Sequence, residues 1–187
     1  MEFNTKKRRQ IRIFRITNIP HMKKWSKILL FCLSSLSLIS WDRATKDLAK
    51  EHLMNKPPVS YFHDTFRLEY AENTGAAMSM GDQLPKNASF WLLGILPLAF
   101  LSGAFVYTLS KAKEFSVGKM LAIAMIFAGG TGNIIDRLLY DRHVTDFMNM
   151  GIYNVRTGIF NFADVCITTG VLLLAVQLLH KKRAVAA

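Results

Sequence analysis

Four long apolar stretches, separated by charged segments, dominate the pattern of hydrophobic and polar positions. Charged residues are absent from 28–41, 87–110, 120–135 and 165–179. The second stretch, about 24 residues, clearly exceeds the roughly 20 that a helix needs to cross a hydrocarbon core. The other three reach that length if polar residues at their ends enter the interface or the bundle interior. The pattern therefore predicts an all-α membrane protein with four transmembrane helices rather than a soluble globule.

The segments between the apolar stretches differ in their patterns. Residues 66–70 alternate between apolar and charged side chains, with the period of two that is typical of a half-buried strand. We therefore expect a small β-sheet cradle after the first span. The sequence at 72–77, ENTGAA, is typical of a turn. The segment 137–163, with glycines among aromatic residues, predicts an irregular arm at the membrane interface.

The net charge of +11 is unevenly distributed and indicates an orientation. Basic residues crowd the first fifteen positions, the segment 111–119 and the residues after 180. Since loops rich in lysine and arginine remain in the cytoplasm, both termini and 111–119 should be cytoplasmic, with 43–86 and 137–163 outside. Topology and anionic membrane lipids explain these charges, so no nucleic-acid partner is expected.

The N-terminal region differs from the rest of the chain. Residues 1–22 are basic and without periodicity, which predicts a disordered tail before a four-span domain at 23–187. Met22 is an alternative natural start, and the first span, which no small-residue cleavage site follows, should remain uncleaved. The two cysteines lie within apolar stretches and the histidines are scattered, so we expect no metal and no cofactor.

Two pairs of opposite charges lie near the expected outer ends of the spans. Asp42 and Lys46 are four residues apart and share a helix face, so they can form an ion pair. Asp136 is followed directly by Arg137, after a glycine-rich stretch that suits close helix contact. Each pair could simply be an interfacial ion pair that fixes a helix end.

Asp146 and Asp164 have no cation nearby in sequence. Ionisable side chains at membrane depth are costly and indicate function, although Asp164 could instead cap the last helix. Two carboxylates in one partly dry site cannot both ionise, so one serves as base and the other as acid. Such a pair can activate water and protonate a carbonyl oxygen, which hydrolyses a peptide. The residues alone leave Asp136 and Asp146 open as the partner of Asp164.

Two other classes of function are possible for membrane carboxylates. A proton-coupled carrier would use them, although we find neither inverted repeats nor broken midplane helices. An assembly scaffold would tolerate loss of both aspartates. The three classes therefore differ in what the carboxylates do.

Five sequence blocks occur in order and resemble the signature motifs of the lipoprotein signal peptidase family, also called signal peptidase II. The blocks are DRATK at 42–46, ENTGAAMS at 72–79, GGTGNIIDR at 129–137, HVTDF at 143–147 and FNFAD at 160–164. The resemblance extends from about Lys23 to the C-terminus. Arg43, Met78 and Thr131 depart from the family's usual residues, and Arg43 stands where glutamine is common.

The resemblance implies a membrane aspartyl endopeptidase. Such an enzyme removes the signal peptide from diacylglyceryl-modified prolipoproteins by cutting before the lipidated cysteine, and Asp146 and Asp164 match its catalytic pair. It implies a bacterial inner-membrane protein, a site near the outer leaflet, contacts with membrane lipids and a monomeric state. Asp42 and Lys46 match a scaffold pair. The positions implied to bind substrate or orient the aspartates are Asn73, Gly129, Asn133, Asp136, Arg137, Asn161 and Ala163.

Overall fold

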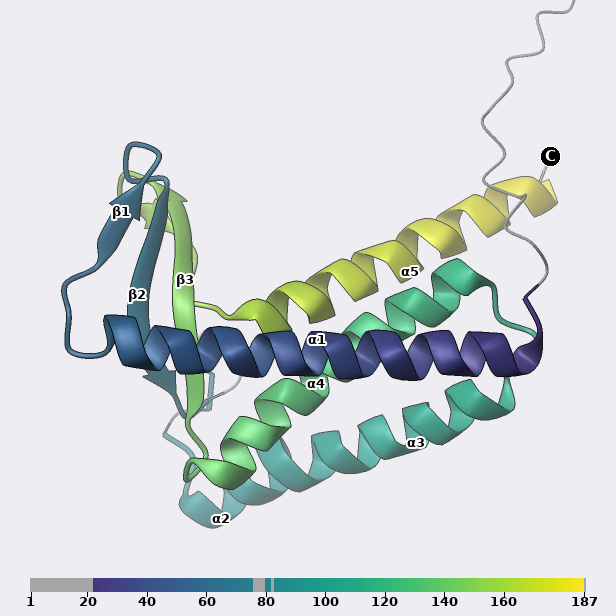
Figure 1. Ribbon diagram of the computed structural model, residues 1–187, viewed down its shortest axis with the longest axis horizontal. Coiled ribbons are helices and arrows are strands. Elements are labelled where there is room, and N and C mark those ends of the chain that lie inside the picture. The colour runs from purple at the N-terminus through teal and green to yellow at the C-terminus, as the bar shows by residue number, and fades with distance from the viewer. Residues whose placement is uncertain (1–21, 76–79, 82, 187) are drawn as a thin grey trace, which may run out of the picture.

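Four helices of the computed structural model are long and apolar enough to cross a membrane. The structure describes residues 22–75, 80–81, 83–186. The spans are α1 (Lys24–Leu53), a continuous segment Lys86–Ser110, α4 (Val117–Leu139) and α5 (Phe162–Ala186). Figure 1 shows them lengthwise, with a small sheet across one end. The predicted four-span helical fold with a small sheet is confirmed, whereas residues 1–21 of the tail predicted at 1–22 lie outside the described residues.

The helices differ in detail from the apolar stretches that predicted them. Helix α1 continues well beyond residue 41, so its outer turns can carry polar residues toward the sheet. The second span consists of α2 (Lys86–Ser89), a π-helical turn η2 (Phe90–Ile95) and α3 (Leu96–Ser110). Pro97, at the start of α3, has no N–H to donate, which suits a local change of helix type there.

Helix α4 is the centre of the bundle and packs against α1, α3 and α5. Glycines allow this approach. A Cβ atom at Gly129 would collide with the carbonyl oxygen of Ala163 on α5, and one at Gly132 would lie 2.5 Å from Asp42 Oδ2 on α1. The glycine-rich stretch before Asp136 thus makes the close helix contacts that it was expected to suit. These contacts bring the polar ends of three helices together.

The sheet has four antiparallel strands in the order β1 (Val59–Tyr61), β2 (Phe66–Asn73), β3 (Val144–Ile152) and β4 (Val155–Arg156). Strand β2 confirms the alternation at 66–70. The expectation of an irregular arm at 137–163 is wrong for β3, which pairs along β2. Most of β3 is buried on both faces, so its sequence does not alternate and gave no strand signal.

The expected turn at 72–77 starts at the end of β2. Asn73 is the last strand residue, paired with Val144, and its side-chain oxygen accepts the Gly75 N–H at 2.9 Å. This local bond turns the chain away from the sheet. Residues 76–79 of the ENTGAAMS block lie outside the described residues.

Candidate active site

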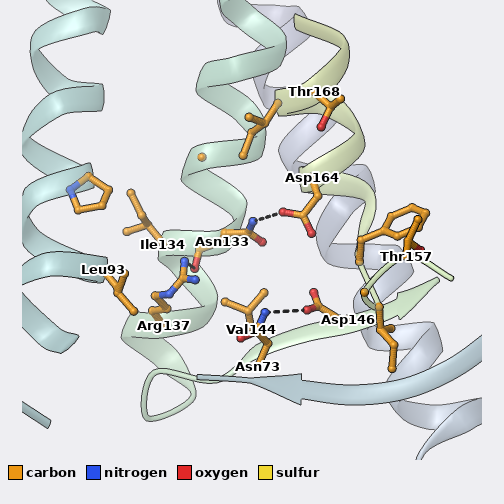
Figure 2. A pocket seen from close by; sticks show the side chains of 16 residues that line it. Asn73, Leu93, Asn133, Ile134, Arg137, Val144, Asp146, Thr157, Asp164 and Thr168 are labelled. Carbon is orange, nitrogen blue, oxygen red and sulfur yellow. Dashed lines mark hydrogen bonds between the residues drawn. The ribbon is translucent and has the colours of Figure 1, made fainter. Parts of the chain in front are cut away.

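A cavity of about 530 Å³ lies where the outer ends of the spans meet the sheet. Asp146 reaches it from β3 and Asp164 from the first turn of α5, and Figure 2 shows their carboxylates facing one another. The structure thus places Asp146 with Asp164 in one cavity. The lining also includes Asn73, Leu93, Pro97, Gly130, Asn133, Ile134, Arg137, Val144, Thr157, Gly158, Ile159, Phe160, Ile167 and Thr168.

Asp164 is fixed by the start of its own helix. Its Oδ2 accepts the N–H of Asn161 at 3.1 Å, and Asn161 Oδ1 accepts the N–H of Asp164 at 3.0 Å. This reciprocal pair is a capping box in which Asn161 precedes the helix and Asp164 closes its first turn. The alternative that Asp164 is an N-cap is therefore wrong in detail, because Asn161 has that position. The capping contact uses one oxygen of Asp164.

Amide side chains hold the remaining carboxylate oxygens. Asn133 donates to Asp164 Oδ1 at 2.9 Å, while Asn161 donates to Asp146 Oδ1 at 2.6 Å. Asn73 donates to Asp146 Oδ2 at 3.1 Å. Asn161 also donates to the side-chain oxygen of Asn133 at 3.1 Å, so the two aspartates belong to one hydrogen-bond network. The amides come from β2, α4 and the start of α5, which fixes the carboxylates relative to all three.

A fully buried ammonium lies behind this network. Lys46 Nζ is 2.8 Å from Asp42 Oδ2 and 2.8 Å from Asp136 Oδ2, and donates to Asn133 Oδ1 at 3.0 Å. Three acceptors match its three donors, as burial of a charged group requires. The expected Asp42–Lys46 pair is confirmed. Asp42 Oδ1 also accepts the N–H of Ala163 at 2.9 Å, which anchors the start of α5.

The expected pairing of Asp136 with Arg137 is wrong. Adjacent helix residues point in directions about 100° apart, so they do not face each other. Asp136 instead pairs with Lys46 and with Arg43, whose Nη1 lies 2.5 Å from Asp136 Oδ1. Arg137 lines the cavity and donates to the carbonyl oxygen of Gly75 at 2.7 Å. Sequence reasoning missed Arg43, which it treated as a departure from a motif.

Burial and charge change the acidity of Asp146. Burial, and after it the nearby charge of Asp164, raise the pKa of Asp146 to about 6, although the hydrogen bonds donated by Asn73 and Asn161 oppose the change. Asp146 can therefore hold or release a proton near neutral pH. Among the residues that the structure describes, no group of three or more His, Cys, Asp or Glu side chains is arranged to hold a metal ion.

Known proteins share both sequence and fold with this chain. The sequence profile of the family described as Signal peptidase (SPase) II matches residues 34–180. The lipoprotein signal peptidase of Borreliella burgdorferi (strain ZS7) is 32% identical over 168 residues, which are 87% of this chain and 95% of that protein. The lipoprotein signal peptidase of Chlorobium phaeobacteroides (strain DSM 266 / SMG 266 / 2430) is 34% identical over 152 residues, covering 77% and 86%.

A solved structure has the same architecture. A bacterial membrane enzyme solved by the in meso method at 2.3 Å resolution superposes with a TM-score of 0.70 at 27% identity, covering 82% of this chain and 89% of that one. The match therefore extends over the spans and the sheet rather than over one motif. With its fold, its motifs and these relatives in agreement, the chain belongs to the lipoprotein signal peptidase family, signal peptidase II.

Proposed function

We propose that this membrane protease is an aspartic endopeptidase in which Asp146 and Asp164 cut prolipoproteins before a diacylglyceryl-modified cysteine. The observation that carries the proposal is the presence of both carboxylates in one cavity, each held by asparagine donors. Asp136, the other partner that the sequence left open, is fully buried and engaged by Lys46 and Arg43. Asp146 is therefore the better partner for Asp164.

The pair works with one shared proton. The raised pKa of Asp146, to about 6, favours a state in which one carboxyl is protonated and the other ionised, and the titration belongs to the pair. The ionised carboxylate removes a proton from water as its oxygen attacks the scissile carbonyl, and the carboxylic acid protonates the carbonyl oxygen. In the second step the carboxyl that took the proton from water passes it to the leaving nitrogen as the C–N bond breaks. The other carboxylate takes a proton from a hydroxyl of the tetrahedral carbon as the carbonyl re-forms, so the pair again holds one proton.

The cavity lining supports a lipid-modified substrate. Leu93 and Pro97 from the second span and Ile167 from α5 give one side of the cavity an apolar surface among the membrane spans. A diacylglyceryl chain holds the substrate in the same membrane leaflet as the site. The substrate therefore reaches the protein by lateral diffusion within the membrane. We further propose that the protein acts as a monomer, with its site near the outer leaflet, its termini in the cytoplasm, and its spans in contact with membrane lipids.

The substrate assignment is tested with the purified protein in detergent micelles. We expect cleavage of a diacylglyceryl-modified prolipoprotein, seen as a gel shift, with mass spectrometry placing the cut directly before the modified cysteine. The matched control is the same prolipoprotein without the lipid. We expect it to be cut at least about tenfold more slowly, because losing about 1.4 kcal/mol of contacts between the lipid and the protein lowers the rate by that factor. Equal rates on both substrates would contradict the lipid requirement.

A further inference from the structure

Asp136 joins the buried charges of α1 to the strand that carries Asp146. Its side chain is 0% exposed and contacts three cationic or N–H donors. Oδ1 pairs with Arg43, while Oδ2 pairs with Lys46 and accepts the backbone N–H of Thr145 at 3.4 Å. Thr145 directly precedes Asp146 in β3. A displacement of the Asp136 carboxylate would therefore move the backbone next to a reacting group.

Arg43 completes the charge balance around Asp136. Asp42 and Asp136 supply two carboxylates, and Lys46 and Arg43 supply two cations. Without Arg43, the buried group would hold two carboxylates against one ammonium. An excess charge out of water is costly, and movement of a carboxylate would relieve it.

The guanidinium of Arg43 is itself held in place. Its Nη2 pairs with Asp47 at 2.9 Å, and its Cζ lies 5.2 Å from the centre of the Tyr140 ring, over which the cation is attracted. The Arg43 side chain is 28% exposed, so it bridges the surface and the buried carboxylate. Arg43 is not among the described residues that line the cavity, so we do not expect it to touch the substrate.

We propose that Arg43 is a positioning residue: it holds the carboxylate of Asp136 in place, and Asp136 thereby holds the start of β3 and the carboxylate of Asp146. This inference rests on the proposed catalytic role of Asp146. Its physical path is a guanidinium–carboxylate pair, a side-chain to backbone hydrogen bond, and one peptide unit. The ion pair is close and the hydrogen bond to the backbone is longer, at 3.4 Å, and both are buried or partly buried.

Replacement of Arg43 should lower the rate of chemistry more than it changes substrate binding. We expect Arg43→Gln to reduce kcat about ten- to a hundredfold, the range given by loss of one hydrogen bond between charged groups, with KM changed less than about twofold. We expect Arg43→Lys to recover most of the rate, because it keeps the charge. Asp47→Asn is the matched control, since it removes the exposed partner of Arg43 and leaves Asp136 in place.

The pH profile separates positioning from loss of folded protein. The groups facing the pair are Lys46 on α1 and Asp136 and Arg137 on α4, together with the two aspartates' own asparagine donors. Removing one positive charge leaves a net negative cluster beside the pair. This negative charge disfavours ionisation of the Asp146–Asp164 pair. The acidic limb of kcat against pH should therefore move to higher pH in Arg43→Gln and lie near its wild-type position in Arg43→Lys.

The experiment measures kcat, KM and the pH profile of wild type, Arg43→Gln, Arg43→Lys and Asp47→Asn, each normalised to folded protein by size-exclusion chromatography. Wild-type kcat in Arg43→Gln, or a loss explained by folded fraction with an unchanged pH profile, would overturn the inference. Asp146→Asn is measured alongside. If that variant still cleaves, the proposed catalytic role fails; if it is inactive while Arg43→Gln behaves as wild type, the inference about Arg43 fails on its own.

Discussion

Asn161 joins three separate tasks in one side chain. Its oxygen caps α5, and its amide nitrogen donates to Asp146 and to Asn133. It is fully buried, so none of these bonds competes with water. An asparagine suits the position because it offers one acceptor and two donors without adding charge beside two carboxylates. The orientation of the acidic pair thus depends on amides as much as on ions.

The acidity of Asp146 predicts a pH-dependent stability. Because the folded-state pKa is about 6 against 3.8 for an exposed aspartate, the folded protein binds this proton more readily than the unfolded chain. The stability from this group is complete below about pH 4 and is lost as the pH rises through about 6. At pH 7.5 the uncharged Asp146→Asn should exceed wild type by up to about 3 kcal/mol, since each pKa unit corresponds to about 1.4 kcal/mol.

Thermal unfolding in detergent across pH 4 to 8 checks this expectation. The difference in Tm between Asp146→Asn and wild type should grow with pH and should shrink toward zero near the acid end. A difference in Tm that stays constant across the range would show that the charge of Asp146 is not the cause.

Single residues also mark how far the sequence could predict the site. The motifs include the two aspartates and their donors Asn73 and Asn133, because each block carries its own polar side chains, but not lining residues such as Leu93 and Thr168. They could not identify the pairing of Asp136 with Arg43, since partners 93 positions apart are set by how α1 packs on α4. Arg137 was the expected partner because it follows Asp136 directly in the sequence. On a helix, however, adjacent side chains point about 100° apart, so Arg137 does not face Asp136.

At the scale of elements, close packing of α4 places the acidic groups. Gly129 faces the carbonyl of Ala163 at the beginning of α5, one residue before Asp164. The hydropathy pattern predicted the spans because lipid requires long apolar helices. It could not predict β3, because a strand buried on both faces lacks alternation. The strand carrying Asp146 was therefore mistaken for an irregular arm.

A methyl group at Gly129 should separate α4 from α5. We expect Gly129→Ala to cost about 1–3 kcal/mol, the usual range for overpacking, and to lower kcat because Asp164 moves with the start of α5. Gly103→Ala is the control, because no described atom lies within 4 Å of its Cβ position and alanine favours a helix. Thermal unfolding and cleavage rates measure both variants. Wild-type behaviour of Gly129→Ala would contradict the close contact.

For the whole molecule, the sheet lies at one end of the bundle, while the α3–α4 connection lies at the other (Figure 1). Asp146 is on strand β3 and Asp164 is in the first turn of α5. Members of this family are multi-pass proteins of the bacterial inner membrane, and the four spans agree with that location. The charge distribution predicted which end faces the cytoplasm. In the predicted orientation, the site would meet substrates that lie in the outer leaflet.

Cysteine labelling tests this orientation. In a variant lacking Cys32 and Cys166, Tyr153→Cys at the 89% exposed tip of the sheet should react with a membrane-impermeant maleimide in intact spheroplasts. Lys113→Cys, in the exposed α3–α4 connection, should react only after the membrane is opened. In intact spheroplasts we expect Tyr153→Cys to be labelled at least about tenfold more than Lys113→Cys. The opposite preference would show that the orientation is the reverse of the predicted one.

The most direct test of the acidic pair is cleavage of a diacylglyceryl-modified prolipoprotein by Asp146→Asn, Asp164→Asn and Asp136→Asn beside wild type. We predict that the first two lose cleavage by at least about a thousandfold, the scale seen when a group central to catalysis is removed, while Asp136→Asn folds and keeps measurable activity. Cleavage by Asp146→Asn together with an inactive, folded Asp136→Asn would contradict the assignment of the pair, and a wild type that never cleaves would favour a carrier.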